Sequence, residues 1–352
     1  MIDWTTSMEQ TFEFYLVDPN TWKDERQLDC ITKCSIKRDS TVATLGSATI
    51  NTTESFDECY IRVYLIAIQN GVKEKVPLGT FLVQTPGVGF DGKSKDISMD
   101  AYTPLIELKG TMPSIGYSLL RDQNIMEIAY LLCREHMRPP VVRTANSEKL
   151  SDDFVSNLDD TWLSFITDLI ANARYNFGLD EMGRVIFEPV QDMAALQSVW
   201  TYDDGNSSIL YPNINDERDL YGIPNVVEVV YSTNAGYVFS RVVNDDPDSI
   251  VSTVNRGREV VYRDSNPSFP GVPSQEYCDA YALATLRNLS CLEHTISYKH
   301  GYCPVRVGDC VTLNYKEAGL VNVKAKVISQ DIDCETGCPV QETAVYTTKL
   351  WR

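Results

Sequence analysis

Apolar and polar residues alternate along the first hundred positions in a way that predicts β-strands. The segments rich in β-branched and aromatic residues are Phe12–Val17, Ile31–Ile36, Thr41–Ile50, Cys59–Ile68 and Gly79–Gln84. Asn70-Gly71 and Asp91-Gly92 are typical of hairpin turns, and the alternation resumes at Ile97–Tyr102. We therefore expect an antiparallel meander that closes into a small barrel.

A helical period replaces this alternation after Pro113. Apolar residues recur at helical spacing from Ile125 to Leu132, and the pattern stops before Pro139-Pro140. A second helix is expected to begin at Asp159-Asp160, as caps, with one apolar stripe. The stripe consists of Trp162, Phe165, Ile166, Leu169, Ile170 and Ala173. A hairpin with a turn ending at Gly183 follows, so residues 114–190 read as a compact α+β module.

Strand patterns return from about residue 195 and continue, with one interruption, to the last residues. The expected strands are Val226–Tyr231, Tyr237–Val243, Thr295–Tyr298, Cys310–Tyr315, Lys324–Ile332 and Thr343–Leu350. Ser274 is expected to cap a helix over residues 274–291 whose inner face carries Cys278, Tyr281, Ala282, Thr285, Leu286 and Leu289. We predict a mainly β fold with an α+β insertion, divided into residues 1–113 (a first β-barrel-like domain), 114–190 (the inserted module) and 191–352 (a second β-barrel-like domain).

Two hairpin segments echo each other in sequence. Residues 80–103 and 325–348 each read as a strand, a turn and a second strand that ends near a Tyr-Thr pair. The echo indicates either two related barrels or two unrelated hairpins, and the pattern alone leaves both interpretations open.

The composition narrows the class of protein. The chain has 352 residues, 43% of them hydrophobic, and opens with Met1-Ile2-Asp3-Trp4 rather than a signal peptide. No run reaches the roughly 18 apolar residues of a membrane span. We therefore expect folding in a cytoplasm, with all ten cysteines reduced. The net charge of −18 argues against a nucleic-acid binder, because DNA would be repelled.

One segment matches a nucleotide-binding motif. Gly87–Ser94 fits the phosphate-loop pattern G-x4-G-K-S, which works when its backbone N–H groups open a helix. The residues that follow, Lys95–Tyr102, instead alternate with the period of a strand. We interpret the segment as a glycine-rich hairpin tip and expect no bound nucleotide.

The cysteine spacing provides candidate pairs of metal ligands. Cys30 and Cys34 are spaced C-x3-C, but two residues four apart in a strand lie about 13 Å from each other and cannot chelate. Cys334 and Cys338 share the same spacing in a turn, which can bring two thiolates together. They lack an evident second pair, since Cys303 and Cys310 are seven apart. We expect no bound zinc, and metal binding at Cys334 and Cys338 stays open.

No catalytic constellation emerges. Cys133 and His136 lie three apart at a helix end, where a histidine more often faces solvent or the helix dipole. The other histidines are His294 and His300. The acid pairs Asp152-Asp153 and Asp203-Asp204, like the acidic loops Asp216–Asp219 and Asp245–Asp248, are expected at the solvated surface. We therefore predict no catalytic, cofactor-binding or metal-binding residues, and not an enzyme.

Three sets of segments carry a resemblance to a known family. They are Leu45–Ile50 leading into Glu58–Tyr64 and Pro77–Phe81; Asp160–Ala173 followed by Leu179–Arg184; and Val305–Val311 continuing to the C-terminus. Together they resemble the tail-hub, or baseplate hub, proteins of phages, prophages and phage-tail-like bacteriocins of Gram-positive bacteria. The resemblance covers most of the chain.

This resemblance implies a structural subunit of the virion tail tip or baseplate, assembled in the host bacterial cytoplasm. It implies two related barrels per chain and a homotrimeric ring, whose six similar units join a sixfold tail tube to the spike and other baseplate proteins. An acidic channel wall would let DNA pass without binding. The alternatives are a tail-tip receptor- or carbohydrate-binding protein, which exposed tyrosines would favour, and a hub with cell-wall hydrolase activity.

Overall fold

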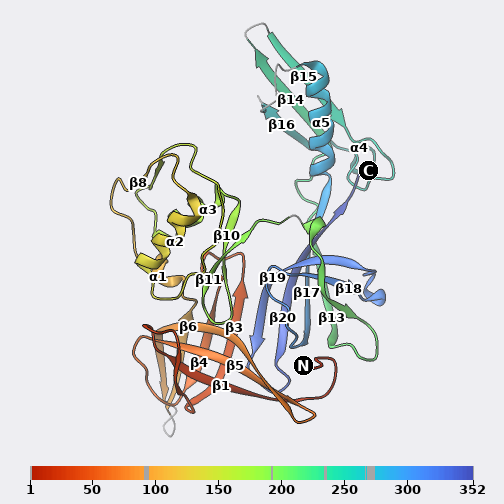
Figure 1. Cartoon of the computed structure of the whole chain (residues 1–352). Coiled ribbons are helices and arrows are strands. Elements are labelled where there is room, and N and C mark those ends of the chain that lie inside the picture. Colours follow the sequence, from red (N-terminus) through yellow and green to blue (C-terminus); the bar gives the residue numbers. More distant parts are fainter. Residues whose placement is uncertain are drawn as a thin grey trace. The chain divides into compact units, whose positions relative to one another are not determined.

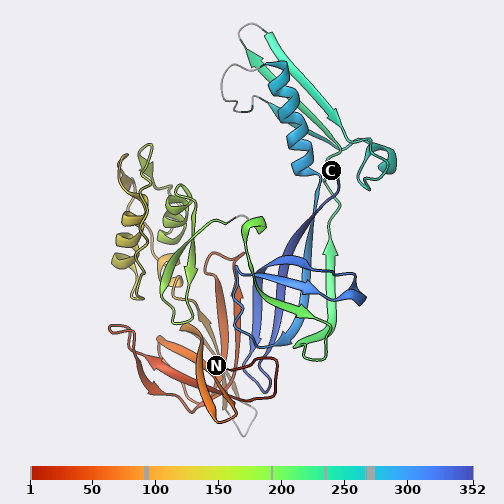
Figure 2. The same ribbon diagram turned by 45° about the vertical axis from the view of Figure 1, so that its right-hand side comes forward.

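The computed structural model describes residues 2–90, 95–191, 193–233, 236–265, 267 and 274–351. The chain divides into two compact units. The first contains residues 1–214 and 298–344, and the second contains residues 215–297 and 345–352. Three long strands, β13 (Leu210–Arg218), β17 (Cys291–Gly301) and β20 (Pro339–Lys349), have residues in both units. Figures 1 and 2 show the elements from two directions.

Most strands belong to one large sheet of the first unit. The other strands of this sheet are β1 (Glu9–Val17), β2 (Asp24–Gln27), β3 (Ile31–Asp39), β4 (Gly46–Thr52), β5 (Cys59–Gln69), β6 (Val72–Phe90), β7 (Lys95–Tyr102), β12 (Ser198–Asp203), β18 (Cys310–Asn314) and β19 (Val323–Asp333). Their order is β13-β17-β20-β19-β3-β4-β7-β6-β5-β1-β2, with β18 beside β19 and β12 beside β18. The mainly β prediction is confirmed.

The antiparallel pairing of β3 with β19 joins the N-terminal and C-terminal strands into this single sheet. Ser35 lies opposite Asp333, and the register continues to Asp39 opposite Ser329. One hydrophobic core accordingly contains Ile50 from β4 together with Val340 from β20, both almost fully buried. Segments about 300 residues apart in the chain therefore fold as one body.

The two echoed segments are both pairs of neighbouring strands. β6 and β7 form an antiparallel hairpin, and β19 and β20 are adjacent in the sheet. That the two segments belong to two related barrels stays a prediction. At Asn70-Gly71 the expected hairpin turn is confirmed: β5 ends at Gln69, β6 begins at Val72, and φ is 51° at Asn70 and 79° at Gly71. The expected strand over Thr41–Ile50 is wrong at its start, because residues 41–45 form a turn and β4 begins at Gly46.

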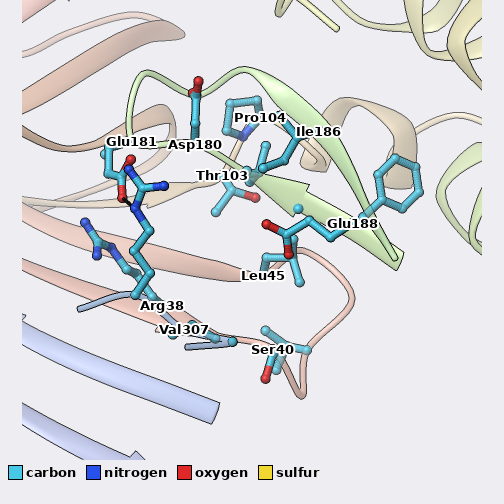
Figure 3. A pocket seen from close by; sticks show the side chains of 18 of the residues that line it. Arg38, Ser40, Leu45, Thr103, Pro104, Asp180, Glu181, Ile186, Glu188 and Val307 are labelled. Carbon is cyan, nitrogen blue, oxygen red and sulfur yellow. Dashed lines mark ion pairs between the residues drawn. The ribbon is translucent and has the colours of Figure 1, made fainter. Parts of the chain in front are cut away.

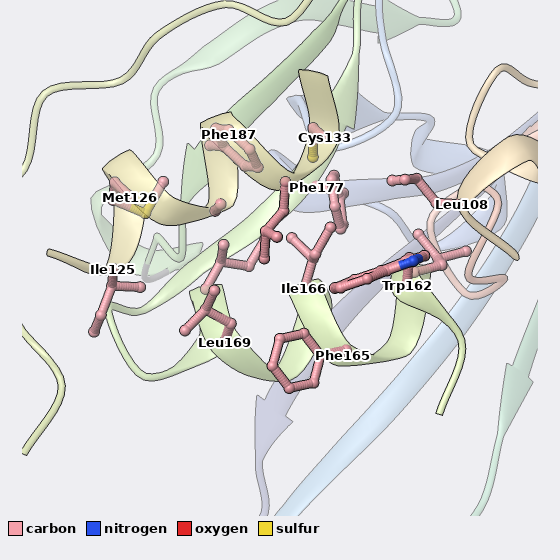
Figure 4. Packing of buried hydrophobic residues seen from close by; sticks show 14 of the residues in the cluster. Leu108, Ile125, Met126, Cys133, Trp162, Phe165, Ile166, Leu169, Phe177 and Phe187 are labelled. Carbon is pink, nitrogen blue, oxygen red and sulfur yellow. The ribbon is translucent and has the colours of Figure 1, made fainter. Parts of the chain in front are cut away.

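The predicted α+β module lies within the first unit. Its elements are α1 (Ile106–Lys109), β8 (Ser118–Leu119), α2 (Ile125–His136), β9 (Phe154–Val155), α3 (Trp162–Ala171), β10 (Tyr175–Leu179) and β11 (Val185–Pro189). The apolar stripe of α3 is buried from Trp162 to Ala173 and packs against α2 and the β10–β11 hairpin (Figure 4). The cap is not Asp159-Asp160 but Thr161, whose side chain and that of Ser164 form a reciprocal capping box.

The second unit is a small sheet with a helix along one face (Figures 1 and 2). Its strands β14 (Val226–Thr233), β15 (Gly236–Val243) and β16 (Val261–Ser265) have the order β15-β14-β16. A short helix, α4 (Thr253–Arg256), precedes β16, and α5 (Gln275–Leu289) packs on β14 and β15. Ser274 caps α5 as expected, but the helix ends at Leu289 because β17 begins at Cys291.

Two 3-10 turns, η1 (Met193–Ala195) and η2 (Lys316–Ala318), complete the described elements. Within the described part of the chain, no helix is both long and apolar enough to cross a membrane.

Candidate functional site

The phosphate-loop match lies on a strand. Residues 87–90 belong to β6, and Phe90 pairs with Lys95 as the antiparallel ladder continues into β7. A phosphate loop needs a helix N-terminus directly after it, and a strand follows here. Residues 91–94, the expected hairpin tip itself, lie outside the described residues.

The cysteines that meet in the structure belong to different C-x3-C pairs of the sequence. Cys34 and Cys338 are buried in the same core, and Cys334 packs against it, so cysteines from both C-x3-C pairs meet. Among the residues that the structure describes, no group of three or more His, Cys, Asp or Glu side chains is placed to hold a metal ion. Cys303 and Cys310 are buried separately from this group, Cys303 against the hydroxyl of Tyr202.

Cys133 and His136 do not form a nucleophile and base. Cys133 is fully buried in α2, where burial raises the pKa of its thiol far above the usual value. The His136 ring instead stacks on Trp162, with ring centroids 4.0 Å apart. A buried neutral thiol without a base is core packing rather than a nucleophile.

The acidic segments have different roles. Asp152-Asp153 and Asp245–Asp248 are in turns or irregular structure, as expected. The prediction of a loop at Asp216–Asp219 is wrong, because residues 216–218 belong to β13. Asp216 there accepts a hydrogen bond from His294 Nδ1 (3.0 Å), within the second unit. This acid therefore pairs inside the fold rather than lining an open loop.

Sequence reasoning missed a buried polar network in the first unit. Its centre is Glu342 in β20, whose side chain is fully buried. Tyr298 donates to Glu342 Oε1 (2.5 Å), Gln330 Nε2 donates to Glu342 Oε2 (2.7 Å), and His300 Nε2 lies 3.5 Å from Glu342 Oε2. Tyr202 completes the group, with its hydroxyl 3.1 Å from His300 Nε2. Both oxygen atoms of this buried side chain therefore have hydrogen-bond partners.

The pKa of His300 is raised within this network. Burial opposes its charged form, but hydrogen bonds to Cys303 and Glu342 together raise the pKa of His300 to about 10. Its Nδ1–H donates to the Gly301 carbonyl (2.7 Å). The one sequence signal was the spacing of His300 and Cys303, three apart. Both side chains are buried, so the pair offers no surface at which a substrate can approach.

The network reaches a pocket of the first unit through Arg38 (Figure 3). Arg38 Nη1 donates to Gln330 Oε1 (3.2 Å), and Nη2 donates to the Leu78 carbonyl (2.7 Å). The pocket has a volume of about 550 Å³. Turn residues after β3, the β10–β11 hairpin and the loop before β18 line it, so it lies where three segments of the unit meet.

Charged groups in this pocket pair with one another. Arg306 Nε lies 2.6 Å from Glu181 Oε1, the pair marked by a dashed line in Figure 3. Burial, and then the nearby Asp309, raise the pKa of Glu188. Arg306 thus joins the loop before β18 to the β10–β11 turn, whereas Arg38 bonds Gln330 of β19 and Leu78 of β6 within the large sheet. This arrangement makes a joint between segments and presents no nucleophile-and-base pair.

Two exposed aromatic side chains lie on one face of the small sheet in the second unit. Val238 packs toward α5, so its neighbours Tyr237 and Phe239 project from the opposite face of the sheet. Tyr237 is 76% exposed and Phe239 43% exposed. Glu228 on the same face pairs with Arg263 (2.7 Å). An aromatic patch beside fixed charges is typical of a protein–protein contact.

Comparison with known proteins identifies this fold. No family model and no curated protein matches the sequence. The structure is similar to the 43 kDa tail protein of prophage MuSo2 from Shewanella oneidensis, with a TM-score of 0.64, 11% identity, and 96% of this chain and 98% of that chain covered. It is similar to the tail protein from Neisseria meningitidis MC58, with a TM-score of 0.60, 12% identity, and 96% and 97% covered.

A third similar structure is the prophage tail protein gp18 from Listeria monocytogenes EGD-e, with a TM-score of 0.50, 11% identity and 94% of both chains covered. At these identities the comparison establishes a shared fold. The chain therefore has, over nearly its whole length, the fold that solved tail proteins adopt.

Proposed function

We propose that this chain is a structural subunit of a phage-type tail, not an enzyme. The observation that carries the proposal is the match over 96% of the chain, and over 98% and 97% of two tail proteins. The paired charges of the pocket and the inaccessible His300–Cys303 pair agree with a structural role. A restriction to Gram-positive bacteria stays a prediction, since the similar proteins come from three different genera.

Within the tail, the position that we propose is the hub: a homotrimeric ring that joins the sixfold tube to the spike, tail tip and baseplate proteins. The supporting features are the two echoed hairpins, one in the N-terminal third and one in the C-terminal third of the chain, and the aromatic face of the second unit. Two barrels in each of three chains present six similar units. In a ring with closed cyclic symmetry, one contact between neighbouring subunits is repeated at every interface, so it buries the exposed aromatic patch of each chain.

The acidic charge suits a ring around a DNA channel. A net charge of −18 per chain cannot be crowded into subunit contacts without repulsion, so acidic side chains are placed on the channel wall and outer faces. Candidates are the residues of the 245–248 loop. Passing DNA is then repelled rather than bound.

Symmetry in the intact particle tests this proposal. Electron microscopy of the particle, with the chain marked by an epitope-specific antibody, is expected to show three copies on the tail axis at the tip. Six copies in a ring, or a position away from the axis, contradicts the hub. Absence of the chain from purified particles contradicts any tail role.

The exposed aromatic side chains also favour a second candidate, a receptor- or carbohydrate-binding tail protein. Tyr221 and Tyr237 are 89% and 76% exposed, and tyrosine rings commonly stack on sugars. A glycan array distinguishes the two candidates. Specific binding that Tyr237→Ala abolishes favours recognition, whereas an array without signal favours the structural role.

A further inference from the structure

Two cysteines 300 positions apart lie opposite each other, Cys34 on β3 and Cys334 directly after the end of β19. In the ladder between β3 and β19, Ile36 pairs with Ile332 and Ser35 with Asp333, so the next opposed positions are Cys34 and Cys334. The Cys334 N–H donates to the Cys34 carbonyl, 3.0 Å away. Opposed residues of this type have Cα atoms about 5.5 Å apart, within the range of about 4.4–6.8 Å that a disulfide spans.

The two side chains already meet. Opposed residues of an antiparallel pair project from the same face of a sheet. The Cys34 side chain is the first cause of the raised pKa of the Cys334 thiol, and both residues pack in the core that contains Cys338. Cys34 is 1% exposed, whereas Cys334 is only half-buried. A small oxidant therefore reaches Cys334 first, with Cys34 behind it.

We propose that Cys34 and Cys334 form a disulfide that locks β3 to β19 after the protein leaves the reducing cytoplasm in which it folds. The timing rests on the proposed function, because a tail subunit is assembled in a cell and then released from it. The geometry does not depend on that function. The proposal departs from the sequence expectation that all ten cysteines stay reduced.

The chemistry is thiol–disulfide exchange with a low-molecular-weight disulfide as oxidant. The Cys334 thiolate attacks one sulfur of the oxidant, forms a mixed disulfide and releases one small thiol. Cys34 then attacks the Cys334 sulfur, the protein disulfide forms, and a second small thiol leaves. Two protein thiols are oxidised, one external disulfide is reduced to two thiols, and the protons of the protein thiols pass to these products.

Cys338 competes with Cys34 as the disulfide partner of Cys334. It follows Cys334 in the turn between β19 and β20, and its N–H donates to the Glu335 carbonyl, so the turn is closed.

The Cys34 side chain, and then burial, raise the pKa of the Cys334 thiol. A raised pKa slows thiol–disulfide exchange at neutral pH, so the oxidation is carried out in alkaline buffer. A disulfide between Cys334 and Cys338 would lie within the turn and would not connect β3 to β19. Only a disulfide between Cys34 and Cys334 locks the two strands together.

Oxidation of the purified full-length chain tests the pair. The protein is incubated with glutathione disulfide in mildly alkaline buffer, remaining thiols are alkylated, and non-reduced peptides are mapped by mass spectrometry. The expected result is a Cys34–Cys334 cross-linked peptide, a protein lighter by two hydrogens, and a higher midpoint of thermal unfolding. Cys338→Ser is expected to retain the cross-link, and the double variant Cys34→Ser with Cys338→Ser to stop at a mixed disulfide on Cys334.

A Cys334–Cys338 link, or a stable mixed disulfide in the unsubstituted protein, overturns the proposal. The map of the unsubstituted chain is decisive even if a variant fails to fold. This experiment needs no particle, so its failure is distinct from failure of the tail assignment. If the pair cross-links in the purified chain but is reduced in released particles trapped with an alkylating agent, the proposed timing is overturned.

Discussion

Arg62 in β5 donates a hydrogen bond from Nη2 to the carbonyl oxygen of Met182, 3.1 Å away and 120 positions further along the chain. The guanidinium group is almost fully buried and also binds Asp24 (2.7 Å) and Thr80 (2.8 Å). Trp22 Nε1 donates to the same Met182 carbonyl (2.7 Å). The turn of the β10–β11 hairpin is therefore fastened to the large sheet by a buried cation.

Arg62→Met is expected to lower the free energy of unfolding by about 3 kcal/mol, because it removes one partner of a largely buried ion pair and leaves Asp24 and the Met182 carbonyl short of donors. Urea denaturation measures the change. Arg184→Met in the same hairpin is the matched control, since Arg184 pairs with Asp180 at the surface and is expected to cost less than about 1 kcal/mol. Equal losses in the two variants would show that the buried clamp is unimportant.

Gly183→Ala is expected to destabilise the chain by roughly 2–4 kcal/mol, from backbone strain plus overpacking. Gly183 has φ of +74°, and a Cβ there would lie 2.7 Å from the Thr80 Cβ. Gly116→Ala separates the two effects, because φ is +77° there and an added Cβ meets no atom within 4 Å. The Gly116 variant is expected to lose only about 1 kcal/mol. A loss at Gly183 no larger than at Gly116 rules out the close approach.

The stability that His300 contributes is expected to depend on pH. The pKa of His300 in the folded chain is raised to about 10 from the usual 6.5, so its contribution is complete below pH 6.5 and is lost as pH rises through about 10. His300→Gln should cost about 3 kcal/mol near neutral pH and much less at pH 10. Urea denaturation of both proteins over this interval gives the difference. A difference that does not change with pH would mean that His300 is neutral in the fold.

Tyr237→Ser together with Phe239→Ser is expected to weaken assembly of the proposed trimer at least tenfold. The second unit is expected to stay folded, since both side chains project away from α5. The dissociation constant of the proposed trimer, from analytical ultracentrifugation, measures the effect. Tyr277→Ser is the control, because Tyr277 is 50% exposed but lies on α5. If the control weakens assembly and the double variant does not, the contact is on the helix side.

The Gly87–Ser94 segment is expected to bind no nucleotide, because β7 follows it where a phosphate loop needs a helix. Calorimetry with ATP and magnesium should show no heat of binding for the unsubstituted chain or for Lys93→Ala. Saturable binding that Lys93→Ala abolishes would overturn this interpretation.

The sequence by itself determined the local elements. The apolar stripe of α3, the Ser274 cap and the Asn70-Gly71 turn were predictable because each depends on residues within a few positions of one another. The same locality explains the errors. Thr41–Ile50 has strand composition throughout, but its first half is the turn that brings β4 back beside β3.

Only the tertiary structure decided which strands are neighbours. The pairing of β3 with β19, the meeting of Cys34 with Cys334 and the enclosure of Glu342 by His300 and Gln330 each depend on register between segments far apart in the chain. A shift of one residue would turn every side chain of a strand to the other face. Strand composition predicts that such pairing exists but not the partner, because many strands of this chain share the same alternation.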